Sequence, residues 1–293
     1  MSRQAFYQRQ RQAQRHQEHA LLVVDIVLAL RREIPGLGTR KLHLLLQQPL
    51  ASSGIRVGRD KLHRLLQTHD LILRQKRQVP KTTNSEHSFQ KYPNLLLDKE
   101  LSAPRQAWVC DITYLCIGLG FGYLSLLTDA YSKLIVGYCL FPLLTTQGCL
   151  NALTMALAKE TNRSADLLHH SDRGSQYCSF QYIQQLRQAG IAISMTQHGD
   201  PYENAVAERV NGILKTDFRL SRVFATFEEA EHAVATSIQN YNHLRPHMSC
   251  GYLTPAAAHE STQPLQKLWK PKTYGSPKAP TDLNSSSSVE AIE

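Results

Sequence analysis

The sequence has 293 residues, enough for one large and one small domain or for two domains of medium size. Apolar residues make up 42% of the chain and charged residues 19%, which is compatible with a globular core. No run of 18 apolar residues occurs, and the basic N-terminal stretch is not followed by an apolar segment, so neither a membrane span nor a signal peptide is expected.

The net charge of +9 is unevenly distributed. Residues 1–81 hold 16 Lys or Arg and five Asp or Glu, a net charge of +11, whereas residues 82–293 carry −2. This asymmetry predicts a nucleic-acid-binding module ahead of a near-neutral core, although a solvated helical surface would give the same count. The six cysteines form no CxxC pair, and we expect free thiols in a reducing cytoplasm.

The N-terminal quarter predicts a small all-α domain. Residues 1–19 form a polar, weakly helical arm, and residues 20–33 have the wide apolar face of a packed helix. Two shorter helices follow, and the second exposes Arg59, Lys61 and Arg64. A short helix, a loop and a basic helix outline a helix-turn-helix unit, so residues 20–77 are predicted to bind DNA. Residues 78–103 are predicted to be a linker, since Pro and polar residues interrupt any periodicity.

The second predicted domain, residues 104–260, is α/β. Three strand-like runs resemble an antiparallel meander, and two shorter strands alternate with helices after them. This order predicts a mixed five-stranded sheet with helices on both faces. Residues 261–293 are expected to be a disordered tail. The predicted strands are 108–117, 121–128, 133–141, 167–170 and 191–196, and the predicted helices are 146–160, 179–189, 204–220 and 226–242.

Two aspartates lie where an acid has few structural uses. Asp111 interrupts the apolar strand WVCDITYL, and central strands exclude a charged side chain unless it is paired or binds a metal ion. Asp172 follows the strand LLHHS, and ligands of α/β folds bind beyond the carboxyl ends of strands. An ion pair would account for Asp111, and a turn in Asp-Arg-Gly would account for Asp172.

A third acid, Glu208, lies early in the long predicted helix. Asn204, Glu208, Asn211 and Lys215 are spaced to form one polar stripe, with Val206, Val210, Ile213 and Leu214 towards the core. Taken alone, the stripe could be a solvated helix face. Together, two aspartates at strands and a glutamate on a helix offer the oxygen ligands for two Mg²⁺ ions, with Mn²⁺ as an alternative. Such a pair of ions promotes in-line displacement at a phosphate.

Other residues compete for these roles. His169 and His170 could indicate a transition-metal site, but no further His or Cys has a supporting spacing. Asp200 and Glu203 could replace Glu208, although they lie in a Gly/Pro-containing loop. Asp129 is expected to end a hairpin strand, and Asp217 lies off the polar stripe. A Ser-His-Asp hydrolase is not favoured, because the sequence has no G-x-S-x-G motif.

Four ordered motifs resemble those of bacterial insertion-sequence transposases of the D-D-E class. They are WVCDITYL, HHSDRGSQYCS, HGDPYENAVAERVNGILKTD and YNHLRPHMSCGYLTPAAA, within a resemblance that covers roughly residues 1–260. The most similar group encodes two overlapping reading frames, and the chain resembles the second-frame product. The family's YDNA stands here as Tyr202-Glu203-Asn204-Ala205, which leaves Glu208 in place. The resemblance implies a ribonuclease-H-like catalytic core shared with retroviral integrases.

The resemblance also implies roles for single residues. Asp111, Asp172 and Glu208 match the family's catalytic and metal-binding acids, and Lys215 matches a basic residue near substrate DNA. The segment 37–77 matches a helix-turn-helix-like region. We therefore expect the DNA-contacting set to be Arg40, Lys41, Arg59, Lys61, Arg64, Arg173 and Lys215.

The expected activity is cleavage of donor DNA at the element's ends and strand transfer by 3′-OH attack. The expected partners are terminal inverted repeats, target DNA, further copies in a multimer and the first-frame product, at the bacterial nucleoid in the cytoplasm. The alternatives are a non-catalytic DNA-binding regulator of the element and a hydrolytic nuclease of the same fold.

Overall fold

The N-terminal quarter of the computed structural model is a bundle of helices. The structure describes residues 3–73, 88–97, 99–197, 203–266 and 268. Helices α1 (Arg3–Glu33), α2 (Thr39–Ala51) and α3 (Arg59–Thr68) pack through Val27, Leu42 and Leu62, none of which is solvent-exposed. The predicted helices of this region are confirmed, and α2 and α3 have the predicted helix, loop and basic helix order.

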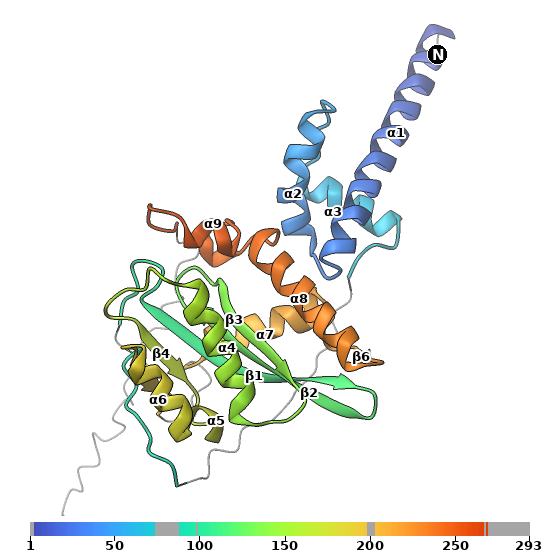
Figure 1. Cartoon of the computed structure of the whole chain (residues 1–293). Coiled ribbons are helices and arrows are strands. Elements are labelled where there is room, and N and C mark those ends of the chain that lie inside the picture. Colours follow the sequence, from blue (N-terminus) through green and yellow to red (C-terminus); the bar gives the residue numbers. More distant parts are fainter. Residues whose placement is uncertain (1–2, 74–87, 98, 198–202, 267, 269–293) are drawn as a thin grey trace, which may run out of the picture.

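One difference concerns the predicted arm. Residues 3–19 continue into the next helix without interruption, so the arm and the helix at 20–33 are one element, α1. The reason is local: neither Gly nor Pro occurs before Pro35, and Gln, Arg and Ala favour the helix. The first half of α1 is exposed and projects away from the rest of the molecule (Figure 1).

The core is a mixed sheet with the order β3-β2-β1-β4-β5. Strands β1, β2 and β3 form the predicted antiparallel meander, and β4 and β5 continue it in parallel with β1. A sixth strand, the two-residue β6, pairs with the far end of β1 and was not predicted, because two residues carry no periodic signal. The strands are β1 (Ala107–Ile117), β2 (Gly120–Asp129), β3 (Ile135–Phe141), β4 (Leu168–Ser171), β5 (Ala192–Met195) and β6 (Val223–Phe224).

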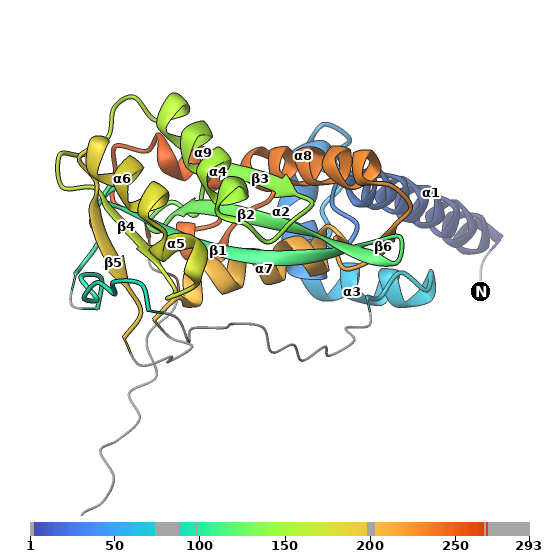
Figure 2. The same ribbon diagram turned by 60° about the horizontal axis from the view of Figure 1, so that its bottom comes forward.

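Helices cover both faces of this sheet, as expected (Figure 2). Trp108, Cys110 and Leu127 pack on one face with α4 (Thr146–Lys159), α5 (Ser175–Cys178) and α6 (Phe180–Gln188). On the opposite face, Leu115 and Leu124 pack with α7 (Ala205–Asp217) and α8 (Phe227–His243). Because side chains alternate along a strand, Asp111 shares the α7 face with Leu115 and not the α4 face with Cys110. A 3₁₀ turn (Met248–Cys250) and α9 (Pro255–His259) follow α8.

The α7 face of the sheet and the N-terminal helices share one apolar cluster. It extends from Leu42 and Leu62 through Ile34 and Leu37 in the α1–α2 turn to Leu214 of α7. At the same turn the Gly36 N–H donates to the Asp217 carbonyl oxygen over 2.6 Å. The helical bundle is therefore docked on the α/β core through the turn that follows α1.

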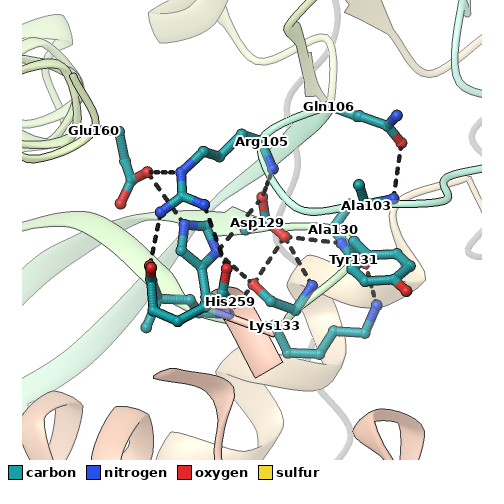
Figure 3. Close-up of polar contacts among 12 residues, drawn as sticks. Ala103, Arg105, Gln106, Asp129, Ala130, Tyr131, Lys133, Glu160 and His259 are labelled. Carbon is teal, nitrogen blue, oxygen red and sulfur yellow. Dashed lines mark hydrogen bonds and ion pairs between the residues drawn. The ribbon is translucent and has the colours of Figure 1, made fainter. Parts of the chain in front are cut away.

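A buried polar cluster ties the end of the core back to its beginning (Figure 3). The guanidinium of Arg105, just before β1, donates to Glu160 after α4 over 2.8 Å and to Glu260 after α9 over 2.7 Å. The Nε2 atom of His259 lies 3.1 Å from the same carboxylate oxygen of Glu160. Asp129 ends β2 as expected, and its carboxylate accepts from the backbone N–H groups of Arg105 and Ser132. The cluster has a structural role, because it fastens α9 against the sheet.

Two predicted segments lie partly outside the described residues. Of the predicted linker 78–103, the part at 88–97 runs beside β5, where the Met195 N–H donates to the Pro93 carbonyl oxygen over 3.2 Å. Most of the predicted tail 261–293, and Asp200, fall among the residues that are not described. Within the described ranges, every helix is too short or too polar for a bilayer crossing.

Candidate active site

The pairing of β1 with β4 brings Asp111 and Asp172 together. The two strands are parallel, and Cys110 lies opposite Ser171, so the next residue of each chain segment is one of the two aspartates. Asp111 lies within β1, whereas Asp172 follows the last residue of β4. The Gly174 N–H donates to Asp172 Oδ1 over 3.0 Å, which fixes the turn after the strand. The turn that was the structural alternative for Asp172 is therefore present, and the register of the two strands still places this carboxylate beside Asp111.

The pKa of Asp111 is affected by both of the other candidate acids, Asp172 and Glu208. Its pKa is raised to about 7, first by burial and then by the negative charge of Asp172, with a smaller contribution from Glu208. Two hydrogen bonds act in the opposite direction: Asn211 Nδ2 donates to Oδ2 over 2.8 Å, and the Ile112 N–H donates to Oδ1 over 2.9 Å. No Lys or Arg ion pair of Asp111 is present among the described residues, so the ion-pair alternative is not supported.

The polar stripe of α7 lies along β1. Asn204 Nδ2 donates to the Cys110 carbonyl oxygen over 3.0 Å, and Asn211 binds the Asp111 carboxylate. The Lys215 ammonium lies 4.4 Å from the centre of the Tyr114 ring, which is a cation–π contact. The opposite side of the helix is buried as predicted, through Val210, Ile213 and Leu214. Periodicity indicated the stripe but assigned no role to Asn211; its spacing of three residues from Glu208 was the available signal.

Glu208 is exposed in the first turn of α7, where a negative charge interacts favourably with the helix dipole. Its charge reaches Asp111, as the raised pKa of Asp111 shows, but less strongly than that of Asp172. Across the described ranges, no group of three or more His, Cys, Asp or Glu side chains is already arranged to hold a metal ion. The structure thus joins the two aspartates closely and leaves Glu208 at the edge of the site.

The competing residues have other contacts. His169 is buried, and its Nε2 lies 2.9 Å from both Cys110 Sγ and Tyr182 Oη; burial lowers its pKa to about 3. His170 Nδ1 lies 2.8 Å from Ser194 Oγ. Glu203 accepts from the Gln197 N–H over 2.6 Å. These contacts stabilise the fold on either side of the aspartates.

A basic hollow of about 620 Å³ lies between the beginnings of α2 and α3. It gathers three of the arginines predicted to contact DNA. Lys61 is exposed on α3 but does not line this hollow, and Arg173 lies beside Asp172 in the turn after β4. The residues that line the hollow are Thr39, Arg40, Arg59, Asp60, His63 and Arg64.

Lys41 has a different environment from that expected. Its ammonium lies 3.3 Å from Asp217 Oδ2, and its side chain is 21% exposed. Burial, followed by the charge of Arg245, lowers its pKa to about 8. The structure therefore places Lys41 in the contact between the helical bundle and α7 instead of on the surface with Arg40, because its side chain leaves the helix on the core side.

This geometry is accompanied by clear sequence similarity. The "Integrase core domain" family matches residues 102–201, and a second family model of the same description matches residues 189–255. The 31 kDa protein of insertion element IS600 from Shigella sonnei is 38% identical, over 84% of this chain and 89% of that protein. The putative transposase of IS986/IS6110 from Mycobacterium tuberculosis is 32% identical, over 74% of this chain and 79% of its own length.

Among solved structures, the simian T-cell lymphotropic virus intasome in complex with PP2A regulatory subunit B56 gamma matches with a TM-score of 0.48. It is 20% identical to this chain, over 82% of this chain and 81% of that one.

The mixed sheet, the paired aspartates and the matched core define an integrase-type polynucleotidyl transferase core. The chain belongs to the bacterial insertion-sequence transposases of the D-D-E integrase superfamily. It is accordingly a DNA transposase, and the predicted ribonuclease-H-like fold is confirmed.

Proposed function

We propose that Asp111, Asp172 and Glu208 are the catalytic acids and that they hold two divalent ions, Mg²⁺ or Mn²⁺. The observation that carries this proposal is the parallel register of β1 and β4, which sets Asp111 beside Asp172; burial and that neighbouring charge raise the pKa of Asp111 to about 7. Crowded carboxylates are costly unless a cation neutralises them, and carboxylate oxygens are the ligands that Mg²⁺ prefers. Because Glu208 is exposed, rotation of its side chain towards Asp111 would complete the ligand set.

The reaction would consist of two in-line displacements at phosphorus. In the first, water attacks at an element end, one P–O bond forms as another breaks, and a 3′-OH is released. In the second, that hydroxyl attacks a target phosphodiester in the same way. Bound divalent ions would activate the attacking oxygen and stabilise the leaving one. No Ser or Tyr nucleophile is required.

The side chains of the protein would position these groups. Asn211 holds Asp111 through a hydrogen bond of 2.8 Å, and Lys215 is kept beside the site by Tyr114. Arg173 lies next to Asp172, where its guanidinium would face a backbone phosphate. Arg40, Arg59 and Arg64 would hold DNA at the basic hollow, with Lys61 on the adjoining surface of α3.

The test is a strand-joining assay with the purified chain, Mg²⁺ and a labelled duplex carrying the element's terminal repeat. Joined products should form with the unchanged chain and disappear with Asp172→Asn or EDTA. Glu203→Gln is the control, since Glu203 contacts the Gln197 backbone. It should retain joining, whereas Glu208→Gln should not. Cleavage without joining would indicate a hydrolytic nuclease.

If the chain binds the duplex but neither cuts nor joins, the assay is repeated with the first-frame segment fused to it. Joining by the fusion alone would show that this chain is a catalytic half, as expected of a second-frame product. Binding without chemistry even in the fusion would overturn the catalytic proposal and favour a regulator.

A further inference from the structure

The turn between α1 and α2 packs backbone against backbone on the end of α7. The Gly36 N–H donates to the Asp217 carbonyl oxygen over 2.6 Å. A Cβ added at Gly36 would lie 2.5 Å from the Asp217 Cα and 2.6 Å from the Thr216 carbonyl oxygen, closer than any real contact. A Cβ at Gly38, two residues further on, would meet nothing within 4 Å. Only glycine fits at the first position in this docked arrangement.

An ion cluster secures the same contact. Asp217 Oδ2 accepts from Arg245 Nε and Nη2 over 2.9 and 2.8 Å and lies 3.3 Å from the Lys41 ammonium. Arg245, which follows α8 in the motif YNHLRPH, is 2% exposed. Lys41 belongs to the helical bundle, whereas Asp217 and Arg245 belong to the core. One carboxylate therefore joins the bundle to the core.

A second contact lies beside the first. Asn240 of α8 donates through Nδ2 to both the backbone carbonyl and the side chain of Glu33, over 3.1 and 3.0 Å. Glu33 is the last residue of α1. The bundle is thus fixed to α7 and to α8 at adjoining points.

Asp217 is also the last residue of the helix that carries the polar stripe. Glu208 lies nine residues earlier on α7, which corresponds to about 14 Å along the axis. Asn211, which holds Asp111, lies between them. Because a helix of this length moves as a rigid element, a shift at Asp217 would displace Asn211 and Glu208 together. The ion pair of Lys41 with Asp217 is therefore a direct link from the bundle to the helix that carries these side chains.

We infer that Lys41 and Asp217 are positioning residues through which the helical bundle sets α7, and hence Glu208 and Asn211, against Asp111. This inference rests on the proposed catalytic role of Glu208. The DNA-binding bundle then contributes to the geometry of the acids, in addition to recruiting DNA. A bundle that only held DNA near the core would, by contrast, leave the metal affinity of the acids unchanged.

The test measures Mn²⁺ binding to the full chain by electron paramagnetic resonance, which requires no DNA substrate. Lys41→Met should weaken Mn²⁺ binding about three- to tenfold, at or below the range seen when the side chains that support metal ligands are removed. Removing a positive charge would by itself strengthen the binding of a cation, so the expected change has the opposite sign to a charge effect. Lys41→Arg should restore binding to within about twofold, because it keeps the ion pair.

Two matched controls and a second docking variant accompany Lys41→Met. Lys159→Met removes the same charge from an exposed site at the end of α4, away from the acids, and should leave Mn²⁺ binding unchanged. Gly36→Ala breaks the docking without changing any charge and should weaken binding as Lys41→Met does, whereas Gly38→Ala should not. Circular dichroism melting identifies any variant that does not fold.

The outcomes separate the two proposals. If Asp111→Asn leaves Mn²⁺ binding unchanged, the proposed metal site is wrong. If Asp111→Asn abolishes binding but folded Lys41→Met and Gly36→Ala bind as tightly as the unchanged chain, the positioning role is overturned and the metal site stands.

Discussion

Asn211 of α7 donates a hydrogen bond of 2.8 Å to Oδ2 of Asp111 on β1. Asn211 as a whole residue is 7% exposed, so this contact is shielded from water. It fixes the orientation of the carboxylate and stabilises its charged form, which opposes the effect of burial on the pKa of Asp111. The orientation of this carboxylate therefore depends on α7 as well as on β1.

Asn211→Ala should raise the pKa of Asp111 further and release its carboxylate. Loss of a partner that orients a metal ligand typically costs 10–100-fold in metal affinity or activity. We expect a cleavage rate about tenfold or more below that of the unchanged chain, with a higher Mg²⁺ requirement, in single-turnover assays across a Mg²⁺ titration. Asn151→Ala, at an exposed asparagine of α4, is the matched control. An unchanged Mg²⁺ requirement would show that Asp111 needs no such support.

The basic hollow predicts a salt-dependent contribution to DNA binding. Removing one phosphate-binding side chain should lower the slope of log affinity against log salt by about 0.9. Replacing Arg40, Arg59 and Arg64 together with Gln should therefore reduce the slope by about 2 to 3 in fluorescence anisotropy measurements with a labelled duplex. Arg222→Gln removes an arginine charge that lies outside the hollow and should leave the slope unchanged. Equal slopes for the triple variant and the unchanged chain would place the DNA elsewhere.

Asp129 is the central acceptor of the buried cluster in Figure 3. Its side chain is fully buried and accepts from the N–H groups of Arg105, Tyr131 and Ser132 and from the Ser132 hydroxyl, over 2.7 to 3.1 Å. Asp129→Asn would turn an amide N–H₂ towards these donors. We expect a loss of about 2–4 kcal/mol in the free energy of unfolding, measured in urea. Asp166→Asn, at an exposed turn, should change it by less than about 0.5 kcal/mol.

Stability should fall in mild acid because two buried histidines resist protonation. Burial is the main cause that lowers the pKa of both His169 and His247 to about 3. Below pH 6.5 the unfolded chain binds protons at these positions while the folded chain does not. The contribution of these histidines to the free energy of unfolding is therefore complete above pH 6.5 and declines as the pH falls towards 3. Each group contributes a slope of up to about 1.4 kcal/mol per pH unit.

The measurement is urea unfolding between pH 7 and pH 5, where most carboxylates remain charged. Asp111 is the exception: its pKa of about 7 adds a slope of opposite sign, which is the same in every chain compared. His247→Gln should give a flatter dependence on pH than the unchanged chain, whatever its absolute stability. The exposed His232→Gln serves for comparison and should keep the original slope. Parallel curves for His247→Gln and the unchanged chain would mean that the imidazole of His247 is accessible to protons.

Much of the core was predictable because its signals are local. The strand around Asp111, the helix around Glu208 and the stripe of α7 follow from periodicity, and the structure confirms each of them. The pairing of Asp111 with Asp172 follows from the parallel register of β1 and β4, which the order of elements suggested without fixing the partners.

The docking of the bundle was not predictable from the sequence. The ion pair of Lys41 with Asp217 joins residues 176 positions apart, and neither has a local pattern that identifies the other. Lys41 follows Arg40 in a basic segment and was therefore expected to bind DNA, whereas its helical position directs it towards the core.

The cluster that contains Arg105 and His259 has a consequence for protein engineering. These residues lie near the two ends of the integrase core, and the Arg105 guanidinium donates to the His259 carbonyl oxygen over 3.3 Å. Because the ends of the core meet in space, a short peptide could connect them, and new termini could be opened at a surface turn such as the one between β1 and β2. Such a circular permutant would keep the acids on their strands and helix while moving the points at which neighbouring domains are attached.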